Sequence, residues 1–342
     1  MTVQQAIAKL VERQNLTRAE AAALMEATIS GQATPAQTAG WLIALRMKGE
    51  TAEEIAGCAE AMRRHAVAIH PQRQKELIDT CGTGADRVKT FNVSTAVAFV
   101  AAAAGIPVAK HGNRAVTSKC GSADVLEALG CRIDLPPEKV AQAIDDIGIG
   151  FLFARMHHPA MKYAAPVRQE LGVRTVFNVL GPLTNPAGAS RQLLGVFAPE
   201  ITRLIAEVLR ELGTERAMVV HGEPGLDELS TLGETVIVHV QEGRIREERI
   251  APESFGFRRA SPEEVAAPDS PQACAERIRQ LFQGEKGAAR DLLLLNAGAA
   301  LVVGGAAQTI AEGIRLAEEV IDSGRAMQVL ERYIQFTQEA GA

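Results

Sequence analysis

From Glu76 onward, short apolar runs alternate with segments that have the pattern of helices. The strand candidates are residues 77–78, 106–108, 149–153, 193–197 and 217–220, and the helix candidates are residues 94–104, 123–129, 138–147 and 200–212. Alternation of this kind builds strand–helix–strand units, whose parallel strands form a sheet with helices on its faces. Two further runs, residues 235–240 and 244–250, have the pattern of a hairpin at a sheet edge. The sequence predicts an α/β fold with a mostly parallel central sheet flanked by helices.

The first 68 residues have a different pattern, that of four short helices. Thr17 with Glu20 and Thr51 with Glu54 have the spacing of capping boxes, and Pro35 follows Thr34 at the start of a third helix. We therefore expect a small helical domain over residues 1–70 and a large α/β domain over residues 71–342. Residues 158–186 interrupt the strand–helix rhythm, so helices from about 160–190 are expected to join the small domain. Residues 271–338 are expected to be helical.

The third of the four helices is apolar on nearly all sides through residues 40–45. A bundle of about 70 residues is too small to hide that much apolar surface by itself. We expect this helix to pack against the rest of the chain, a second subunit, or both, and we predict a homodimer formed through the helical domain.

The composition is that of a globular enzyme, with 47% hydrophobic and 23% charged residues in 342. The net charge of −5 argues against general nucleic-acid binding. No apolar run has the length that a membrane span requires, and the N-terminus lacks the apolar core of a signal peptide. The cysteines, which have neither metal-binding nor disulfide-framework spacing, are Cys58, Cys81, Cys120, Cys131 and Cys274. We expect a cytoplasmic protein with free thiols and without nucleic-acid or membrane partners.

The segment Lys110–Asp124 concentrates cations, amides, hydroxyls and two glycines between a predicted strand and a predicted helix. Such a segment offers many hydrogen-bond donors with little bulk, which suits a phosphate ester. Lys110 supplies a point charge, Asn113 an amide, and Gly121-Ser122 begin the next helix. The alternative is a solvated basic loop.

A second segment of this kind, Gly82-Thr83-Gly84-Ala85-Asp86, precedes a helix that starts near Ser94. Backbone amides at the start of that helix could bind a phosphate group. Arg87 stands where a dinucleotide-binding loop has its third glycine, so that fingerprint is absent. A tight turn is the alternative here. Two such segments predict one ligand with phosphates at both ends.

Two carboxylates, Asp227 and Glu228, follow the strand candidate at residues 217–220. Mg²⁺ prefers one or two carboxylates together with water and phosphate oxygens, so this pair suits a pyrophosphate-bearing substrate. A solvated acidic turn is the alternative reading.

A further polar cluster contains His157, His158 and Arg168. The histidines lack a third ligand at the spacing of a zinc site. One helix beginning at His158 would place Met161, Ala165 and Arg168 on a similar face, where Arg168 could bind a carboxylate in bidentate fashion. A surface arginine is the alternative.

Together these motifs resemble the anthranilate phosphoribosyltransferase family of tryptophan biosynthesis, whose fold is similar to that of the pyrimidine nucleoside phosphorylases. The resemblance covers essentially the whole chain and rests on GTGAD, NVST, KHGNRAVTSKCGSAD, HHPAMKYAAPVR, VFNVLGPLTNPA and HGEPGLDELS in the family's order. It implies transfer of the 5-phosphoribosyl group of phosphoribosyl pyrophosphate (PRPP) to the amine of anthranilate. Catalysis would be electrostatic and positional, without a dedicated catalytic base. Magnesium is the implied cofactor, with two ions expected per subunit.

The resemblance also implies which residues bind each ligand. Anthranilate would contact Gly82, Asn113 and Arg168, and the metal would be held by Ser94, Asp227 and Glu228. PRPP would be bound by Gly82, Ala85, Asp86, Thr90, Asn92, Val93, Ser94, Thr95, Lys110, His111, Gly112, Asn113, Arg114, Ala115, Val116, Thr117, Ser118 and Ser122.

The sequence departs from the family pattern at a few positions. Ala85 stands where glycine is usual, Cys120 where serine is common, and Arg87-Val88-Lys89 is more basic than the usual loop. Two other functions remain open at this point: a related phosphoribosyltransferase for another aromatic acceptor, and a non-catalytic relative that binds nucleic acid. The KHSTGG-type signature of nucleoside phosphorylases is absent.

Overall fold

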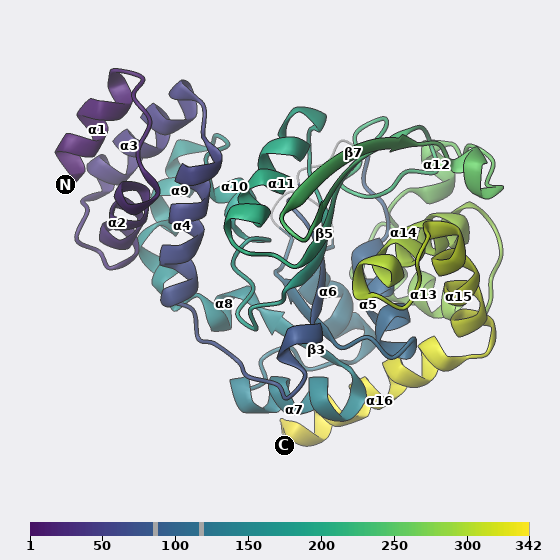
Figure 1. The fold of residues 1–342 in the computed structure, drawn as a ribbon. Coiled ribbons are helices and arrows are strands. Elements are labelled where there is room, and N and C mark those ends of the chain that lie inside the picture. Colours follow the sequence, from purple (N-terminus) through teal and green to yellow (C-terminus); the bar gives the residue numbers. More distant parts are fainter. Residues whose placement is uncertain (85–87, 116–119, 342) are drawn as a thin grey trace.

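The computed structural model describes residues 1–84, 88–115 and 120–341, which form a small helical part beside a large α/β part (Figure 1). The small part begins with four helices, α1 (Val3–Val11), α2 (Arg18–Ile29), α3 (Pro35–Lys48) and α4 (Ala52–Arg64). The predicted capping boxes are confirmed at α2 and α4, and α3 begins at the predicted Pro35 with a further box formed by Thr34 and Gln37. A fourth box, which the sequence analysis did not identify, has Thr2 and Gln5 at α1. Local hydrogen bonds thus fix where each helix begins.

The predicted α/β architecture is confirmed by one seven-stranded sheet with the order β3-β2-β1-β4-β5-β6-β7. Strands β1 to β5 are parallel, and β6 and β7 form the expected antiparallel hairpin at one edge. Their bounds are β1 (Ile78–Gly82), β2 (Val108–Gly112), β3 (Ile149–Phe153), β4 (Arg191–Gly195), β5 (Arg216–Gly222), β6 (Thr235–Gln241) and β7 (Arg244–Ile250). The expectation for β2 was wrong, since the strand starts at Val108 and continues through Lys110 and His111. The strand expected at residues 193–197 begins two residues earlier in the structure, where β4 comprises residues 191–195.

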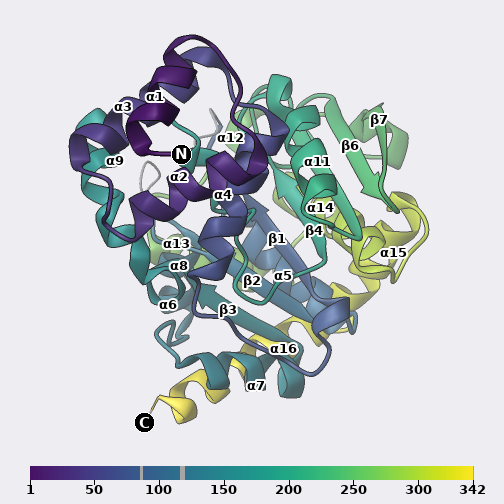
Figure 2. The same ribbon diagram turned by 60° about the vertical axis from the view of Figure 1, so that its left-hand side comes forward.

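Helices cover both faces of the sheet (Figure 2). Side chains alternate between the faces, so that Leu193 joins one apolar core and Leu194 the other. The first core contains α5 (Val93–Ala103), α6 (Ser122–Leu129), α13 (Pro271–Phe282), α14 (Ala288–Gly304), α15 (Ile310–Asp322) and α16 (Arg325–Ala340). On the other face lie α11 (Thr202–Glu211) and the four N-terminal helices. Helix α7 (Pro137–Ile147) packs beside β3, and α12 (Pro262–Val265) near α14. Short 3-10 turns occupy Gln74–Glu76, Pro199–Ile201 and Pro252–Phe255.

The segment that interrupts the strand–helix rhythm consists of several short helices. They are α8 (Ala154–His157), the 3-10 turn η2 (Pro159–Tyr163), α9 (Ala165–Leu171) and α10 (Phe177–Leu180). Helix α9 packs on α3, and α10 packs on α4 (Figure 1). The prediction of one continuous helix from His158 was wrong. The backbone leaves helical geometry at His158, and Pro159 and Pro166 lie at the first and second positions of two new short elements.

Within the described residues, no helix is both long and apolar enough to cross a membrane.

Candidate functional site

The carboxyl ends of β1, β2, β4 and β5 lie at the same edge of the sheet because these strands are parallel. The loops that follow β1, β2 and β5 carry the Gly82 segment, the Lys110 segment and the acidic pair. Ligands of open α/β sheets bind at this edge. The fold therefore gathers three motifs that are separated by up to about 145 residues of sequence.

The acidic pair contacts the Gly82 segment directly. Asp227 Oδ2 accepts a hydrogen bond from the backbone N–H of Gly84 at 2.7 Å, and Glu228 Oε2 accepts one from the Thr90 hydroxyl at 2.9 Å. Asn296 of α14 holds the same turn, since its amide bonds both the N–H and the carbonyl of Leu229. The described structure thus places these carboxylates beside the Gly82 segment, one of the two segments predicted to bind phosphate.

Three glycines let the acidic turn approach the strand ends closely. An added Cβ would lie 2.2 Å from Asp227 Oδ2 at Gly82, 1.5 Å from the Asp227 carbonyl at Gly195, and 2.5 Å from the Glu228 carbonyl at Gly222. Gly82 and Gly195 are paired in register on β1 and β4. The sequence analysis gave no role to Gly195, because only the strand order brings it beside residues 32 positions later.

A small cavity of about 20 Å³ lies under this turn, between the carboxylates and the strands. Thr80, Ser94, Asp227 and Glu228 supply oxygen atoms to its lining. That volume admits one water-sized group. Among the described residues, no cluster of three or more His, Cys, Asp or Glu side chains could bind a metal. A metal here would therefore need hydroxyl, water or ligand oxygens to complete its shell.

Lys110 lies inside the fold rather than on a solvated loop. It is 3% exposed, and its ammonium group donates to the Thr80 carbonyl at 2.5 Å and to Ser94 Oγ at 3.3 Å. Burial lowers the pKa of this ammonium, while the nearby carboxylates of Asp79, Glu228 and Asp227 oppose the shift. Lys110 thus contributes a positive charge behind Ser94, at the start of α5.

Beneath Lys110, a fully buried carboxylate connects β1 to two other segments. Asp79 accepts a hydrogen bond from the backbone N–H of His111 at 3.2 Å and one from Asn185 Nδ2 at 2.8 Å. Burial raises the pKa of Asp79 to about 6, although the Lys110 charge and the Asn185 bond oppose that shift. The sequence analysis assigned no role to Asp79. Its signal was a single charged residue within an otherwise apolar strand.

His111 is buried as well, with its ring beside that of His158. Its Nδ1 contacts the Gly181 carbonyl at 3.1 Å, and the two ring centroids are 5.2 Å apart. Burial lowers the pKa of His111 to about 3 and that of His158 to about 4. Both rings are therefore neutral at pH 7. Nε2 of each is buried without a hydrogen-bond partner.

The start of α5 carries polar groups that the helix itself does not satisfy. Asn92 is the N-cap residue, yet its side chain makes no capping bond and instead donates to the Cys120 carbonyl at 3.1 Å. Asn92 Oδ1 and Thr95 Oγ1 are buried without partners. The first amides of a helix point toward its N-terminus, where they favour an anion.

Within the Lys110 segment, hydrogen bonds connect the β2 end to the start of α6. The Asn113 carbonyl accepts a bond from the Ser122 hydroxyl at 3.2 Å, and Asp124 accepts from the N–H groups of Ala115 and Gly121. Arg114 forms ion pairs with Asp124 at 3.0 Å and Glu127 at 2.5 Å. The Arg114 guanidinium is thus directed to α6.

Arg168 on α9 is half-buried, with its guanidinium carbon 5.0 Å from the centre of the Phe177 ring. Burial lowers the pKa of its guanidinium. Among the described residues, none forms a hydrogen bond or an ion pair with that group. No such contact joins Arg168 to Asn113 or Gly82 either, so the structure does not connect the three predicted anthranilate contacts.

Five of the predicted PRPP contacts lie outside the described residues: Ala85, Asp86, Val116, Thr117 and Ser118. The basic residue Arg87 lies there too. The remaining contacts, Gly82, Thr90, Asn92, Val93, Ser94, Thr95, Lys110, His111, Gly112, Asn113, Arg114, Ala115 and Ser122, belong to β1, β2, α5, α6 and their connections.

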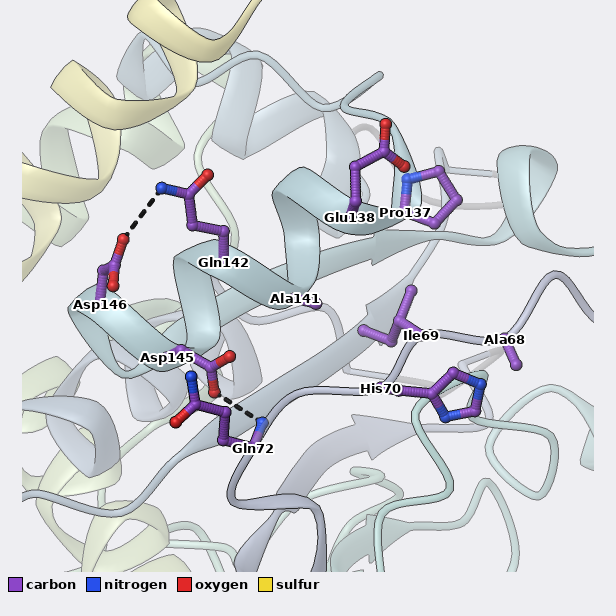
Figure 3. Close-up of a pocket in the computed structure, with 10 residues that line it drawn as sticks. All are labelled: Ala68, Ile69, His70, Gln72, Pro137, Glu138, Ala141, Gln142, Asp145 and Asp146. Carbon is purple, nitrogen blue, oxygen red and sulfur yellow. Dashed lines mark hydrogen bonds between the residues drawn. The ribbon is translucent and has the colours of Figure 1, made fainter.

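A larger cavity lies away from this edge of the sheet (Figure 3). It measures about 530 Å³, between the chain that leaves α4 and helix α7. Gln72 N donates to Asp145 across it, and Glu138, Asp145 and Asp146 make its lining acidic. It contains none of the predicted site residues, and its negative charge disfavours a phosphate ligand.

The fold and this site define a class of protein, the glycosyl transferases with a helical bundle and an α/β domain. Residues 4–66 match the model for the helical bundle domain of the glycosyl transferase family, and residues 74–327 match the model for its a/b domain. The chain belongs to this family.

Within that family, the relatives agree on one enzyme. The chain is 52% identical to the anthranilate phosphoribosyltransferase of Acetivibrio thermocellus, over 98% of this chain and 96% of that protein. It is 49% identical to the one from Laribacter hongkongensis, over the full length of both. The crystal structure of the Thermus thermophilus enzyme superposes with a TM-score of 0.92 at 48% identity, covering 97% of this chain and 99% of the other.

A structure of the Saccharomyces cerevisiae enzyme in complex with PRPP and Mg has a TM-score of 0.89 at 28% identity, covering 98% of each chain. Another, with 4-fluoroanthranilate, has a TM-score of 0.88 at 27% identity and the same coverage. The chain is thus a member of the anthranilate phosphoribosyltransferases and is a phosphoribosyl-transferring enzyme of tryptophan biosynthesis. The family and the enzyme class expected from the sequence are confirmed.

Proposed function

We propose that this chain transfers the 5-phosphoribosyl group of PRPP to the amine of anthranilate at the carboxyl edge of its sheet. The products are N-(5-phosphoribosyl)anthranilate and pyrophosphate. One observation supports this most strongly: the hydrogen bonds of Asp227 to Gly84 and of Glu228 to Thr90 unite an acidic pair with a loop that precedes a helix N-terminus. Anion-binding amides beside two carboxylates suit a substrate that carries both phosphates and a cation.

PRPP binds, in this proposal, to the two segments that follow β1 and β2. The amides at the start of α5 and the buried Lys110 ammonium face the same region, so both favour the negative charge of a phosphate group. The Asn113 backbone and Ser122 at the start of α6 provide the second anion-binding end. The predicted contacts that lie outside the described residues, Ala85, Asp86 and Val116 to Ser118, belong to the same two segments of the sequence.

Magnesium is the proposed cofactor, as it is in the S. cerevisiae complex with PRPP and Mg. The donors available are two carboxylates, Asp227 and Glu228, and the Ser94 hydroxyl beside the small cavity. Hard oxygen donors of this kind fit Mg²⁺, which keeps several waters or phosphate oxygens in its shell. When bound, the metal neutralises the pyrophosphate leaving group. Two ions per subunit remain the proposed number.

Catalysis follows from charge placement rather than from a base. Breaking the bond between C1 and pyrophosphate separates charge, so groups aimed at the leaving group lower the barrier. An aromatic amine is neutral at pH 7 and already nucleophilic. Arg168, with Asn113 and the Gly82 backbone, then orients anthranilate through its carboxylate. The neutral His111 ring lies nearby without a charge to compete for that carboxylate.

The proposal divides the chain into two domains. The small helical domain comprises residues 1–70 and is joined by helices from about 160–190, and the large α/β domain comprises residues 71–342. This division is supported by the packing of α9 on α3 and of α10 on α4. Movement of the smaller unit over the site would exclude water that could hydrolyse PRPP.

A homodimer through the helical domain is also part of the proposal. The exposed large apolar side chains of the described residues are Met1, Met47, Val11, Val67, Met156, Tyr163 and Val173. All belong to residues 1–67 or to the 154–173 segment that packs near them. Met47 on α3 is 72% exposed, which is expected for a side chain that a second subunit covers in a dimer interface. The five cysteines are free thiols, which supports a reducing, cytoplasmic location.

The deciding experiment follows the fluorescence of anthranilate with purified protein, PRPP and Mg²⁺. The expected result is a decrease that requires all three components, with pyrophosphate released in equal amount. Pyrophosphate release only with another aromatic amine would identify a different acceptor. Absence of release with any acceptor, together with binding to nucleic acid, would refute the proposal in favour of a non-catalytic relative.

A further inference from the structure

Two thiols of the large domain, those of Cys120 and Cys274, lie against each other near the start of α6. Cys274 belongs to α13 and is fully buried, whereas Cys120 is half-buried and packs on the same apolar core. The two side chains interact with each other, while the Cys120 thiol also donates a weak hydrogen bond, at 3.6 Å, to the carbonyl of Gly121. Helices α6 and α13 pack side by side (Figure 2). The pair therefore bridges two elements that are distant in sequence.

The Cys120 side of the pair is tightly connected to the predicted PRPP site. Its carbonyl accepts the side-chain hydrogen bond of Asn92, the N-cap of α5. The next residue, Gly121, is packed so closely that an added Cβ would lie 2.4 Å from the Ala115 nitrogen. A displacement of Cys120 toward α13 must therefore also shift the backbone at Asn113–Ala115 and break the contact with Asn92.

The Cys274 side is connected to the acidic pair. Its thiol donates a weak bond, at 3.9 Å, to the carbonyl of Pro268. One residue earlier, the Ala267 N–H donates to the Lys89 carbonyl at 2.7 Å, and Thr90 pairs with Ala266. Thr90 in turn donates to Glu228. The two thiols are thus connected to both parts of the proposed site, Cys120 to the start of α5 and Cys274 to the acidic pair.

We propose that Cys120 and Cys274 are an oxidation site whose disulfide bond links the segment before α6 to α13 and weakens PRPP binding. A disulfide holds its sulfurs at about 2.0 Å, which is closer than two hydrogen-bonded thiols can lie. Cys120 is the thiol that moves, because α13 is anchored in the core by its own buried residues. The movement is transmitted through Gly121 to Asn113–Ala115.

The chemistry is thiol–disulfide exchange with a small disulfide such as oxidised glutathione. The half-buried Cys120 thiolate attacks one sulfur, forming a mixed disulfide and releasing one glutathione thiol with the proton from Cys120. The Cys274 thiolate then attacks the Cys120 sulfur, forming the intramolecular bond and releasing the second glutathione. The contact with Cys274 and burial raise the pKa of the Cys120 thiol, so the exchange is run at alkaline pH, where more of its thiolate is present. A dithiol reductant reverses both steps.

The test oxidises the full-length protein with oxidised glutathione, blocks the remaining thiols and maps its peptides by mass spectrometry. The expected product is a peptide pair joined through Cys120 and Cys274, with Cys58 and Cys131 still reduced because they are buried. Calorimetric titration with PRPP and Mg²⁺ should show affinity reduced about tenfold or more, and dithiothreitol should restore it.

Cys274→Ala and Cys274→Ser are the matched variants, the second retaining a donor toward Pro268 in case the first does not fold. In both, Cys120 should carry a glutathione adduct that never resolves. A stable adduct at Cys120 in the wild-type protein, with no joined peptide, would overturn the proposal. So would a joined peptide without any change in PRPP affinity.

The affinity measurement rests on the proposed function, whereas the peptide map does not. If the reduced protein fails to bind PRPP, the proposed function is wrong and the joined peptide still decides whether the oxidation site exists.

Discussion

The Asp79 carboxylate and the Asn185 side-chain amide meet at 2.8 Å, although 106 residues separate them in the sequence. The same amide also donates to the Ala109 carbonyl of β2, and Asp79 accepts the His111 N–H. Asp79 thereby connects β1, β2 and the chain before β4 directly below Lys110. Because all of these groups are buried away from water, each depends on the others for its hydrogen bonds.

Asp79→Asn should destabilise the protein by about 1–3 kcal/mol, because its new amide would face the Asn185 amide, donor against donor. The buried Lys110 ammonium would also lose its opposite charge. Urea unfolding at pH 7 measures the change. Asp146→Asn is the control, since the exposed Asp146 carboxylate on α7 accepts a hydrogen bond from the Gln142 amide of the same helix and is not part of a buried network. Equal midpoints for the two variants would mean that Asp79 does not organise this network.

The buried His158 makes the stability depend on pH. Burial lowers its pKa in the folded protein to about 4, against about 6.5 in the unfolded chain. Below pH 6.5 the unfolded chain takes up a proton that the folded chain does not, so this contribution to the free energy of unfolding falls as the pH falls toward 4. Between pH 6.5 and 5 the loss should be about 1.5 kcal/mol.

His158→Gln should remove that loss, which is measured by urea unfolding at both pH values. Other titrating groups, including Asp79, are present in both proteins, so the difference between the two reports on His158 together with its effect on the neighbouring His111. An identical pH dependence of wild type and variant would contradict a neutral, buried His158.

Much of the architecture could be predicted because local signals encode it. The Thr–Glu and Thr–Gln spacings specify helix starts through hydrogen bonds within four residues, and the apolar runs locate β3 and β5 closely. The order of strands could not be predicted, since β4 inserts between β1 and β5 through contacts without a local signature. For the same reason the roles of Asp79, Asn185, Gly195 and Asn296 were missed. The break at His158 was missed because helical spacing was given more weight than Pro159 and Pro166.

Arg168→Ala should raise the KM for anthranilate about ten- to a hundredfold and change that for PRPP little. Loss of a charge-assisted contact costs about 1.5–3 kcal/mol, and among the described residues the Arg168 guanidinium contacts the Phe177 ring without a hydrogen bond or an ion pair. Steady-state kinetics with each substrate varied in turn measures both constants. Arg155→Ala on the exposed side of α8 is the control. Equal increases for both substrates would indicate that Arg168 only supports the fold.

Met47→Glu should convert the proposed dimer into monomers, because it places a charge on the most exposed large apolar side chain of the described residues. Sedimentation velocity at micromolar concentration measures the change. Gln283→Glu adds the same charge to the exposed end of the large domain and should leave the dimer intact. A monomeric wild-type protein would refute the dimer, and a dimeric Met47 variant would move the interface off α3.

Gly195→Ala should weaken the response to Mg²⁺ without altering any proposed ligand. The new Cβ would lie 1.5 Å from the Asp227 carbonyl, so the turn that carries Asp227 and Glu228 must move away from β4 and from Ser94. The Mg²⁺ concentration for half-maximal activity should rise about tenfold, and overpacking should cost about 1–3 kcal/mol of stability. Gly181→Ala is the matched control, because a Cβ there meets no atom within 4 Å. Asp227→Asn should reproduce the Mg²⁺ effect with a smaller loss of stability. If Gly195→Ala instead loses stability alone, with its Mg²⁺ requirement unchanged, the close approach of this turn to β4 serves the fold and not the metal.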